Sequence, residues 1–430
     1  MLNLIGVIIA FVLVIYLIRK KFNFGLSLII GSIIIAIFSL SDVPLMDVFK
    51  GFGKALIYDF DENIFDFQTI ELAILLTLIY ILAKTMQQTD AINKMIKSLR
   101  TIFYKGGTLG VIPAVYGLMP VPGGALFSAP LIDEEGKKFN LKQNQKNFLN
   151  VWWRHIWFPI FPVSSAMLLI IGSKFSNIGI YELIFANFPA FIAFIAIGII
   201  YIKIYIKDVP PLKNRPKKDY RGLVFLIPPI IPIIVYILIF VLLFLIGFDD
   251  ANKFQRGIFV VGVLLSFVVL YFLLKIDFKQ YLDTLKKSIS LNLALAIVGI
   301  MIFREIFEVS KANQIITDSI SSLSFPPILI LILIPLLLGF LTGYNFGAIA
   351  LSYFLVQPFF ELIDLNIVGL TSIIFISSLV GYLISPIHLC NVVSSDYLKT
   401  DTTRMYKMYL PAITSLMLIQ TIFILIFYGS

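Results

Sequence analysis

A long apolar stretch in the first half of the chain is interrupted near its centre by MPVPGGA, residues 119–125. The apolar run extends from Leu109 to Ile132, which is long enough to cross a bilayer, but its prolines and paired glycines interrupt a regular helix. Backbone freed at membrane depth must be buried in protein or line a watery cavity. The stretch is therefore predicted to be a re-entrant hairpin over residues 107–133, two half-helices that meet at a glycine-rich tip.

A second interrupted stretch lies in the other half of the chain. It runs from Pro327 to Phe360 and is broken by TGYNFG, residues 342–347, so a second hairpin is predicted over residues 326–360. Each half also holds an apolar helix that proline breaks. These broken helices are residues 148–172, with prolines at 159 and 162, and residues 367–398, with the pair Ser385-Pro386.

The interrupted segments belong to a weak internal repeat with an offset of roughly 220 residues. Without gaps, Leu78–Lys84 lies over Val298–Arg304, and Asn93–Ile96 lies over Asn313–Ile316. A duplicated membrane unit with a broken helix in each copy indicates a secondary transporter whose site lies between the halves. The predicted organisation is a first repeat over residues 1–206, a cytoplasmic linker over 207–222 and a second repeat over 223–430.

Composition places the chain in a membrane. Of its 430 residues, 59% are hydrophobic and 14% are charged, which leaves more apolar surface than a soluble domain of this length could bury. A helix that crosses the bilayer needs about 20 apolar residues. We expect an all-α integral membrane protein with about ten spans, at Leu2–Ile18, Phe24–Leu40, Thr69–Ala83, Phe148–Ile171, Leu183–Ile206, Leu223–Ile246, Gly257–Leu274, Ser288–Phe303, Ile367–Leu389 and Met408–Phe427.

The net charge of +9 comes from Lys and Arg in short loops between spans, so it does not indicate nucleic-acid binding. Alternate loops, including Arg19–Lys21 and Lys207–Arg221, are basic, whereas the other loops are richer in Asp and Glu. Basic loops stay in the cytoplasm, which predicts a protein of the cytoplasmic membrane with both termini outside. The first hairpin would enter from the cytoplasm and the second from the exterior, so the second repeat would be inverted. The basic linker is also expected to meet anionic membrane lipid.

The scarcity of cysteine and of membrane-depth carboxylates limits the kinds of site that the chain can form. Cys390 is the only cysteine, which excludes an intramolecular disulfide and a cysteine-rich metal cluster. No Asp or Glu lies in the apolar part of either hairpin or at either helix break. Because cation antiporters generally need a carboxylate at membrane depth, an anionic or neutral solute is favoured.

The order of three spans, a hairpin, a broken span and a further span, found twice, resembles the ion transporter superfamily, as does MPVPGGA at the first tip. That superfamily holds dicarboxylate and citrate sodium symporters, gluconate permeases and arsenite or proton antiporters. In particular, the chain looks like the uncharacterised ten-span family known as domain of unknown function 401. The resemblance implies an inverted-repeat, elevator-type transporter, usually a homodimer, that holds its substrate between two opposed hairpin tips and two helix breaks.

The resemblance also shows a departure at the tips. Characterised symporters of the superfamily carry Ser-Asn-Thr at each tip for the substrate carboxylate and sodium. Here the second tip offers Thr342 and Asn345, whereas the first offers no hydroxyl or amide before Ser128. One candidate sodium site, at Thr342 and Asn345, is therefore expected, and no other cofactor.

Candidate substrate contacts follow from the tips and the breaks. A half-helix that begins at the paired glycines would point unpaired N–H groups at an anion. Alternatives remain, since the glycines could serve helix packing, the serines could bond back to the preceding turn, and the imidazole could be a proton relay or a core histidine. The candidate residues are Pro122, Gly123, Gly124, Ser128, Ser164, Ser165, Thr342, Asn345, Gly347, Ser385 and His388.

The pair Arg154-His155 lies about one turn before the Pro159 break, so either side chain could reach the substrate. Trp152, Trp153 and Trp157 around them are also typical of an aromatic belt at the membrane interface. The predicted function is secondary transport, not catalysis, of a small anion such as an organic acid, coupled to sodium or protons. The alternatives are a cation or proton antiporter of the same fold, and an intramembrane enzyme or lipid-handling protein, for which no catalytic constellation is evident.

Overall fold

The computed structural model describes residues 2–103, 106–118, 124–207, 217–247, 254–314, 316 and 326–429. Helices dominate this part of the chain, and its strands are the short antiparallel pair β1 (Tyr58–Asp59) and β2 (Ile64–Phe65). Eight of the described helical segments are long and apolar enough to cross a membrane. The prediction of an all-α, multi-pass membrane protein is therefore confirmed.

Each span predicted in the first half coincides with a helix, and the 148–172 segment is interrupted as predicted. The helix α3 has polar residues on one side and was not among the predicted spans. The helices are α1 (Leu2–Arg19), α2 (Phe24–Ser39), α3 (Leu45–Leu56), α4 (Gln68–Gln88), α5 (Ala91–Ile102), α6 (Thr108–Gly117), α7 (Ala125–Lys137), α8 (Gln143–Arg154), α9 (Ser165–Ile170) and α10 (Ile180–Tyr205).

The second half has a similar order, including a short polar helix, α13, before the third long helix. Residues 208–216 of the predicted linker lie outside the described residues. The helices are η1 (Arg221–Leu226), α11 (Ile227–Leu245), α12 (Gln255–Leu274), α13 (Phe278–Ser288), α14 (Asn292–Val309), α16 (Pro327–Thr342), α17 (Asn345–Val356), η3 (Gln357–Leu362), α18 (Ile367–Ile384), α19 (Leu389–Leu398) and α20 (Thr402–Phe427).

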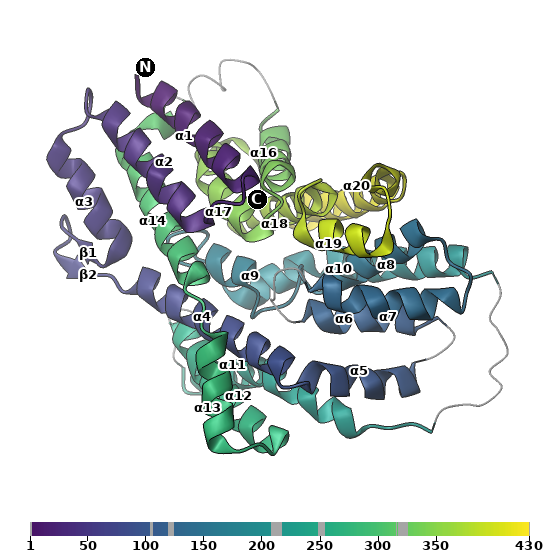
Figure 1. Ribbon diagram of the computed structural model, residues 1–430. Coiled ribbons are helices and arrows are strands. Elements are labelled where there is room, and N and C mark those ends of the chain that lie inside the picture. Colours follow the sequence, from purple (N-terminus) through teal and green to yellow (C-terminus); the bar gives the residue numbers. More distant parts are fainter. Residues whose placement is uncertain are drawn as a thin grey trace.

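The helices pack in two groups, and each group takes members from both halves of the chain (Figure 1). One group contains α1–α4 and α11–α14, in which α2 packs on α14 and α12 packs on α4. The other contains α6–α10 and α16–α20, in which α7 packs on α19 and α17 on α9. The α18–α19 segment is the most enclosed of the candidate spans, 78% buried, whereas the η1–α11 segment is 22% buried. The interrupted helices therefore lie inside the protein.

Glycines allow α2 and α14 to approach backbone to backbone. A Cβ added to Gly25 would lie 2.2 Å from the Leu295 carbonyl oxygen, and one added to Gly299 would lie 2.4 Å from the Gly25 carbonyl oxygen. Close helix contacts through small residues are the usual way in which membrane helices associate, because lipid provides no hydrophobic drive. This contact fixes the second long helix of the first half to the third long helix of the second half.

Both predicted hairpins are pairs of adjacent, packed helices, α6 with α7 and α16 with α17. The second tip turns at Gly343, whose φ of 59° favours glycine, and Tyr344 leads into α17. The first tip includes residues 119–123, so Pro122 and Gly123 lie outside the described residues, whereas Gly124 directly precedes α7. No other predicted site residue is outside them.

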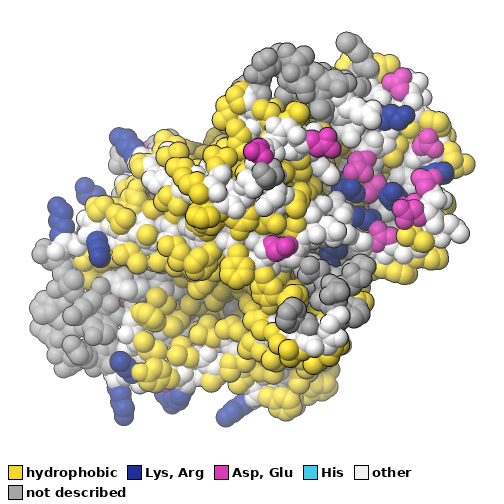
Figure 2. Space-filling view, turned by 180° about the vertical axis from the view of Figure 1, so that it is seen from behind, with side chains coloured by type: hydrophobic (Ala, Val, Ile, Leu, Met, Phe, Trp, Pro, Cys, Tyr) yellow, Lys and Arg dark blue, Asp and Glu magenta, His cyan; other side chains and the backbone are white. Residues whose placement is uncertain are grey.

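Large apolar side chains cover the outside of the protein, as expected of a surface in contact with lipid. Figure 2 shows hydrophobic side chains across the middle of one face, with Lys and Arg at its left and lower edges and acidic side chains gathered at the upper right. Ion pairs Lys50–Asp61, Lys54–Asp59 and Lys174–Asp66 lie around α3 and the β1–β2 pair. Acidic side chains thus gather around α3, where lysines pair with them, whereas the left and lower edges in Figure 2 carry Lys and Arg.

Candidate functional site

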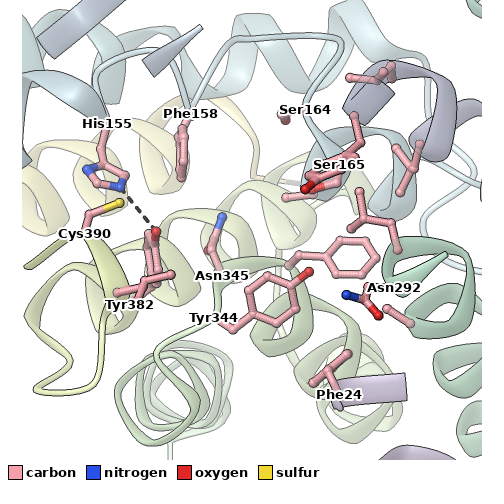
Figure 3. Close-up of a pocket in the computed structure, with 18 of the residues that line it drawn as sticks. Phe24, His155, Phe158, Ser164, Ser165, Asn292, Tyr344, Asn345, Tyr382 and Cys390 are labelled. Atoms are coloured by element: carbon pink, nitrogen blue, oxygen red, sulfur yellow. Dashed lines mark hydrogen bonds between the residues drawn. The ribbon is translucent and has the colours of Figure 1, made fainter. Parts of the chain in front are cut away.

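A cavity of about 430 Å³ lies where the interrupted helices meet the other helix group (Figure 3). Its lining includes the end of α6, the α8–α9 break, the start of α17 and the α18–α19 break. The opposite wall is formed by α2, α4 and α14, through Asn23, Tyr80 and Asn292 among others. All four segments that the sequence marks as interrupted therefore reach one cavity at the boundary between the two groups.

The α8–α9 break supplies hydroxyls to this cavity. The chain leaves α8 after Arg154 and re-enters a helix at Ser165, with Ser164 as the N-cap whose Oγ accepts a bond of 3.3 Å from the Met167 amide. Ser164 and Ser165 both line the cavity, as predicted. The Pro159 carbonyl oxygen, which lies in this break, accepts a bond of 3.0 Å from Asn187 Nδ2. That carbonyl is therefore already engaged within the protein.

Arg154 is the cation in the cavity lining, and its side chain is tied to the first hairpin. Its Nη1 donates to the Tyr116 carbonyl oxygen at 2.8 Å, and only 4% of the residue is exposed. A Cβ added to Gly124 would lie 2.2 Å from Arg154 Nη2, so the guanidinium packs directly against the start of α7. Gly124 therefore makes room for this cation, in addition to any role at the tip.

The tryptophans around Arg154 do not form an interfacial belt, and that alternative is wrong. Trp152 is fully buried and Trp153 is 8% exposed. The indole N–H groups of Trp152 and Trp157 donate to the Phe194 and Ala114 carbonyl oxygens, both at 3.0 Å. These rings hold α8 against α10 and α6, because an indole can fill interior space while its N–H finds a partner.

At the second tip, Asn345 lines the cavity and Thr342 does not. Asn345 is 5% exposed, and its side-chain oxygen has no hydrogen-bond partner among the described residues. The Thr342 hydroxyl donates to the Leu338 carbonyl oxygen at 2.7 Å, the back-bonding expected of Thr in a helix. A Cβ added to Gly347 would lie 2.5 Å from the Phe24 ring, so Gly347 serves the packing of α17 on α2.

The α18–α19 break places aromatic and sulfur groups at the cavity. Ser385 Oγ donates to the Phe340 carbonyl oxygen at 2.6 Å, which fastens the break to the second hairpin rather than opening it to a ligand. Tyr382 and Cys390 line the cavity, and Figure 3 shows the Tyr382 hydroxyl beside His155. His388 is fully buried behind this wall, with its ring centroid 4.9 Å from that of His155.

Ser128 lies outside the cavity lining, in a buried polar cluster between α7, α8 and α19. Its Oγ donates to Asn150 Oδ1 at 2.6 Å, and Asn150 Nδ2 donates to Ser394 Oγ at 2.8 Å. This cluster joins a hairpin helix of the first half to the broken helix of the second. Its role is to hold these elements together.

The base of the first hairpin is held by ion pairs at the end of α7. Lys146 Nζ lies 2.9 Å from Asp133, and Arg100 and Lys138 lie 2.7 and 2.8 Å from Glu135. Burial raises the pKa of Glu135, but the hydrogen bonds from Lys138 and Arg100 outweigh it and hold that pKa below its usual range. Glu135 is therefore ionised at neutral pH and paired on two sides.

The structure thus brings Ser164, Ser165 and Asn345 of the predicted site into one cavity and keeps Ser128, Thr342, Gly347, Ser385 and His388 outside its lining. The wall from α2, α4 and α14 was not predicted, because ordinary apolar helices gave no signal there. Cys390 and Tyr382 were also missed. The signal for Cys390 was its position two residues after His388 at a helix break.

Comparison with known proteins confirms the expected likeness to the domain of unknown function 401 family. A family model described as a protein of unknown function, DUF401, matches residues 3–427. No curated protein matches the chain.

Proposed function

The chain belongs to the DUF401 family, and we propose that it is a secondary transporter that moves a small anion, such as an organic acid, coupled to sodium or protons. The observation that carries this proposal is the charge of the cavity. Its lining has the guanidinium of Arg154 and, among the described residues, no carboxylate. Charged side chains at membrane depth are rare and usually mark a solute pathway.

Helix ends reinforce the preference for an anion. The helices α7, α17 and α19 begin at Ala125, Asn345 and Leu389, beside or within the cavity wall. Each leaves unpaired N–H groups and the positive end of a helix dipole at its start. Arg154 and three helix N-termini together favour a carboxylate more strongly than any of them alone.

The two helix groups support an inverted repeat and an elevator mechanism. Each half contributes the same order of elements. The second long helix of each half packs on the third long helix of the other half, α2 on α14 and α12 on α4. The interrupted helices form one group, and the cavity lies at its border with the second. In an elevator, the first group would move past the second and carry the solute. The second would stay fixed and, in a homodimer, would form the interface between the two copies.

Charge separation supports the orientation proposed for the membrane. The Lys- and Arg-bearing edges in Figure 2 would face the cytoplasm, and the acidic end near α3 would face outward. Both termini would then be external in the cytoplasmic membrane, and the basic linker would lie near anionic lipid on the inner side.

Coupling to sodium would use one site at the second tip. Asn345 Oδ1 is buried and meets no hydrogen-bond partner in the described part of the chain, so it could accept a hard cation. The Thr342 oxygen already donates to Leu338, although it retains a lone pair. Coupling to protons would instead use the imidazoles next to the cavity.

A counterflow experiment in proteoliposomes tests the proposal. Vesicles loaded with one organic acid at a time, with imposed sodium or proton gradients, should accumulate the matching labelled acid from outside. A cation or proton antiporter would respond to cation gradients and ignore every acid. If neither class of solute moves, an intramembrane enzyme or lipid-handling protein becomes the better hypothesis.

A further inference from the structure

The chain contains two histidines and one cysteine, and all three meet at one point of the fold. His155 follows α8 in the first half, whereas His388 and Cys390 flank the start of α19 in the second. One ligand atom from each residue, two ring nitrogens and the thiol sulfur, lies within 4.8 Å of the others, and all three residues are buried. The convergence of the chain's only imidazoles and only thiol, from opposite halves, is the feature to be explained.

A backbone carbonyl fixes the tautomer of the His155 ring. Its Nδ1 lies 2.6 Å from the Val151 carbonyl oxygen, and because a carbonyl cannot donate, Nδ1 carries the proton. In the neutral ring, Nε2 then has a lone pair, which accepts from the Tyr382 hydroxyl at 3.3 Å. A backbone carbonyl that fixes the tautomer of a histidine is the usual support behind a metal-binding imidazole.

His388 has no such support. The Leu383 carbonyl is near enough to influence the ring, but within the described part of the chain neither ring nitrogen meets a partner at hydrogen-bond geometry. The residue is fully buried, and a buried polar group without a partner is rare and costly. Its ring packs on Tyr382, with centroids 3.9 Å apart, and close to His155. A metal ion accepts lone pairs, so it could bind both this imidazole and the neighbouring thiol.

We propose that His155, His388 and Cys390 form a binding site for a borderline-soft divalent metal ion of the Zn²⁺ type. Two imidazole nitrogens and a thiolate are ligands that Zn²⁺ prefers, and three protein ligands leave a fourth position open. Tetrahedral Zn²⁺ would hold these atoms about 3.3–3.6 Å apart. The widest separation of 4.8 Å must therefore close by about 1 Å, which side-chain rotation in the cluster can provide.

The cavity would give access to the fourth coordination position of the metal. His155 and Cys390 line this cavity together with Arg154. The guanidinium would favour a negatively charged fourth ligand on the metal. The site stands on its own residues and does not depend on the transport proposal.

Cobalt substitution tests the site in purified full-length protein. Co²⁺ bound by a thiolate gives an intense near-ultraviolet charge-transfer band, and Zn²⁺ should remove it by competition. Losing one of three ligands should weaken Co²⁺ binding at least about tenfold to a hundredfold, since loss of an outer-shell partner alone costs that much. Cys390→Ser should abolish the band, and His388→Ala should show the weakened binding.

Asp396→Asn is the matched control, because this acid is on α19 like Cys390 but its side chain is 84% exposed. Its Co²⁺ affinity should equal that of the wild type. A second readout uses the single cysteine: Zn²⁺ should protect Cys390 from alkylation, and a chelator should restore its reactivity. Wild-type protein without the thiolate band, or His388→Ala protein with unchanged affinity, would overturn the proposal.

Discussion

The two helix breaks occupy matching places in the two halves, yet they bring different chemistry to the cavity. The first, between α8 and α9, is preceded by Arg154 and ends in two serines that line the cavity. The second, between α18 and α19, is closed by the Ser385 bond to Phe340 and presents Tyr382 and Cys390. Breaks at matching places in the order of elements therefore bring a charged side chain from one half and soft, polarisable side chains from the other. The comparison teaches that the order of elements determines which segments reach the cavity, whereas single residues determine what the cavity can hold.

Replacing the cation of the first break should have the largest effect. Arg154→Gln removes the positive charge that faces the cavity, and losing a buried charged partner costs about 2–5 kcal/mol, or at least about thirtyfold in affinity. Counterflow of the preferred acid should fall below detection. Arg154→Lys keeps the charge but loses the two-pronged geometry, so its uptake should lie between the two. Unchanged uptake by a folded Arg154→Gln protein would place the anion elsewhere.

Filling the space beside that cation should have the next largest effect. In Gly124→Val, the added Cβ would start 2.2 Å from Arg154 Nη2 and displace the guanidinium. A shift of about 1 Å in a binding group can cost about a hundredfold in rate, so transport should be nearly lost in a well-expressed protein. Gly257→Ala is the control, because a Cβ there would meet only Glu71 Oε1 at 3.6 Å. Equal losses in both variants would indicate general damage to folding.

Much of the framework could be predicted because proline and glycine act locally. The interruptions at residues 119–124, 159–162 and 385–386 report backbone that cannot remain helical, and the structure has a break or a hairpin at each position that it describes. The side-chain contacts could not be predicted in the same way. Ser128, Thr342 and Ser385 all bond within the protein, because a hydroxyl gives the same sequence signal whether it faces a ligand or a nearby carbonyl.

The residues from separate helices were harder still. Nothing in the sequence links His155 to Cys390, since their proximity results from the packing of two halves more than two hundred residues apart. Asn292 and Tyr80 reach the cavity only because α14 and α4 pass beside the interrupted group. Sequence therefore identified the elements that carry the site, and tertiary packing selected the side chains.

A smaller effect is expected at the second tip. Asn345→Ala removes an unpartnered amide oxygen, and a single neutral interaction is worth about 0.5–1.5 kcal/mol. The sodium concentration for half-maximal uptake should rise roughly twofold to twelvefold. Thr342→Ser retains the hydroxyl and should leave this value unchanged. If sodium has no effect on the wild type, while a proton gradient drives uptake and His388→Ala abolishes that response, then the second half couples protons instead.

The smallest effect concerns how the two hairpins are held at their bases. Both hairpins pack through close glycine contacts, Gly117 against the Arg154 backbone in the first and Gly381 against the Leu336 backbone in the second. The first is held in addition by the ion pairs of Glu135 with Arg100 and Lys138. The pKa of Glu135 is lower in the folded protein than in the unfolded chain. Its contribution to stability is therefore present above the unfolded pKa of about 4.3 and disappears as pH falls through the folded pKa. Between neutral pH and about pH 3, the melting temperature of the wild type should therefore fall a few degrees more than that of Glu135→Gln. If the melting temperatures of the two proteins change equally with pH, the ion pairs at this base add nothing to stability. The two hairpins would then differ in chemistry at their tips alone.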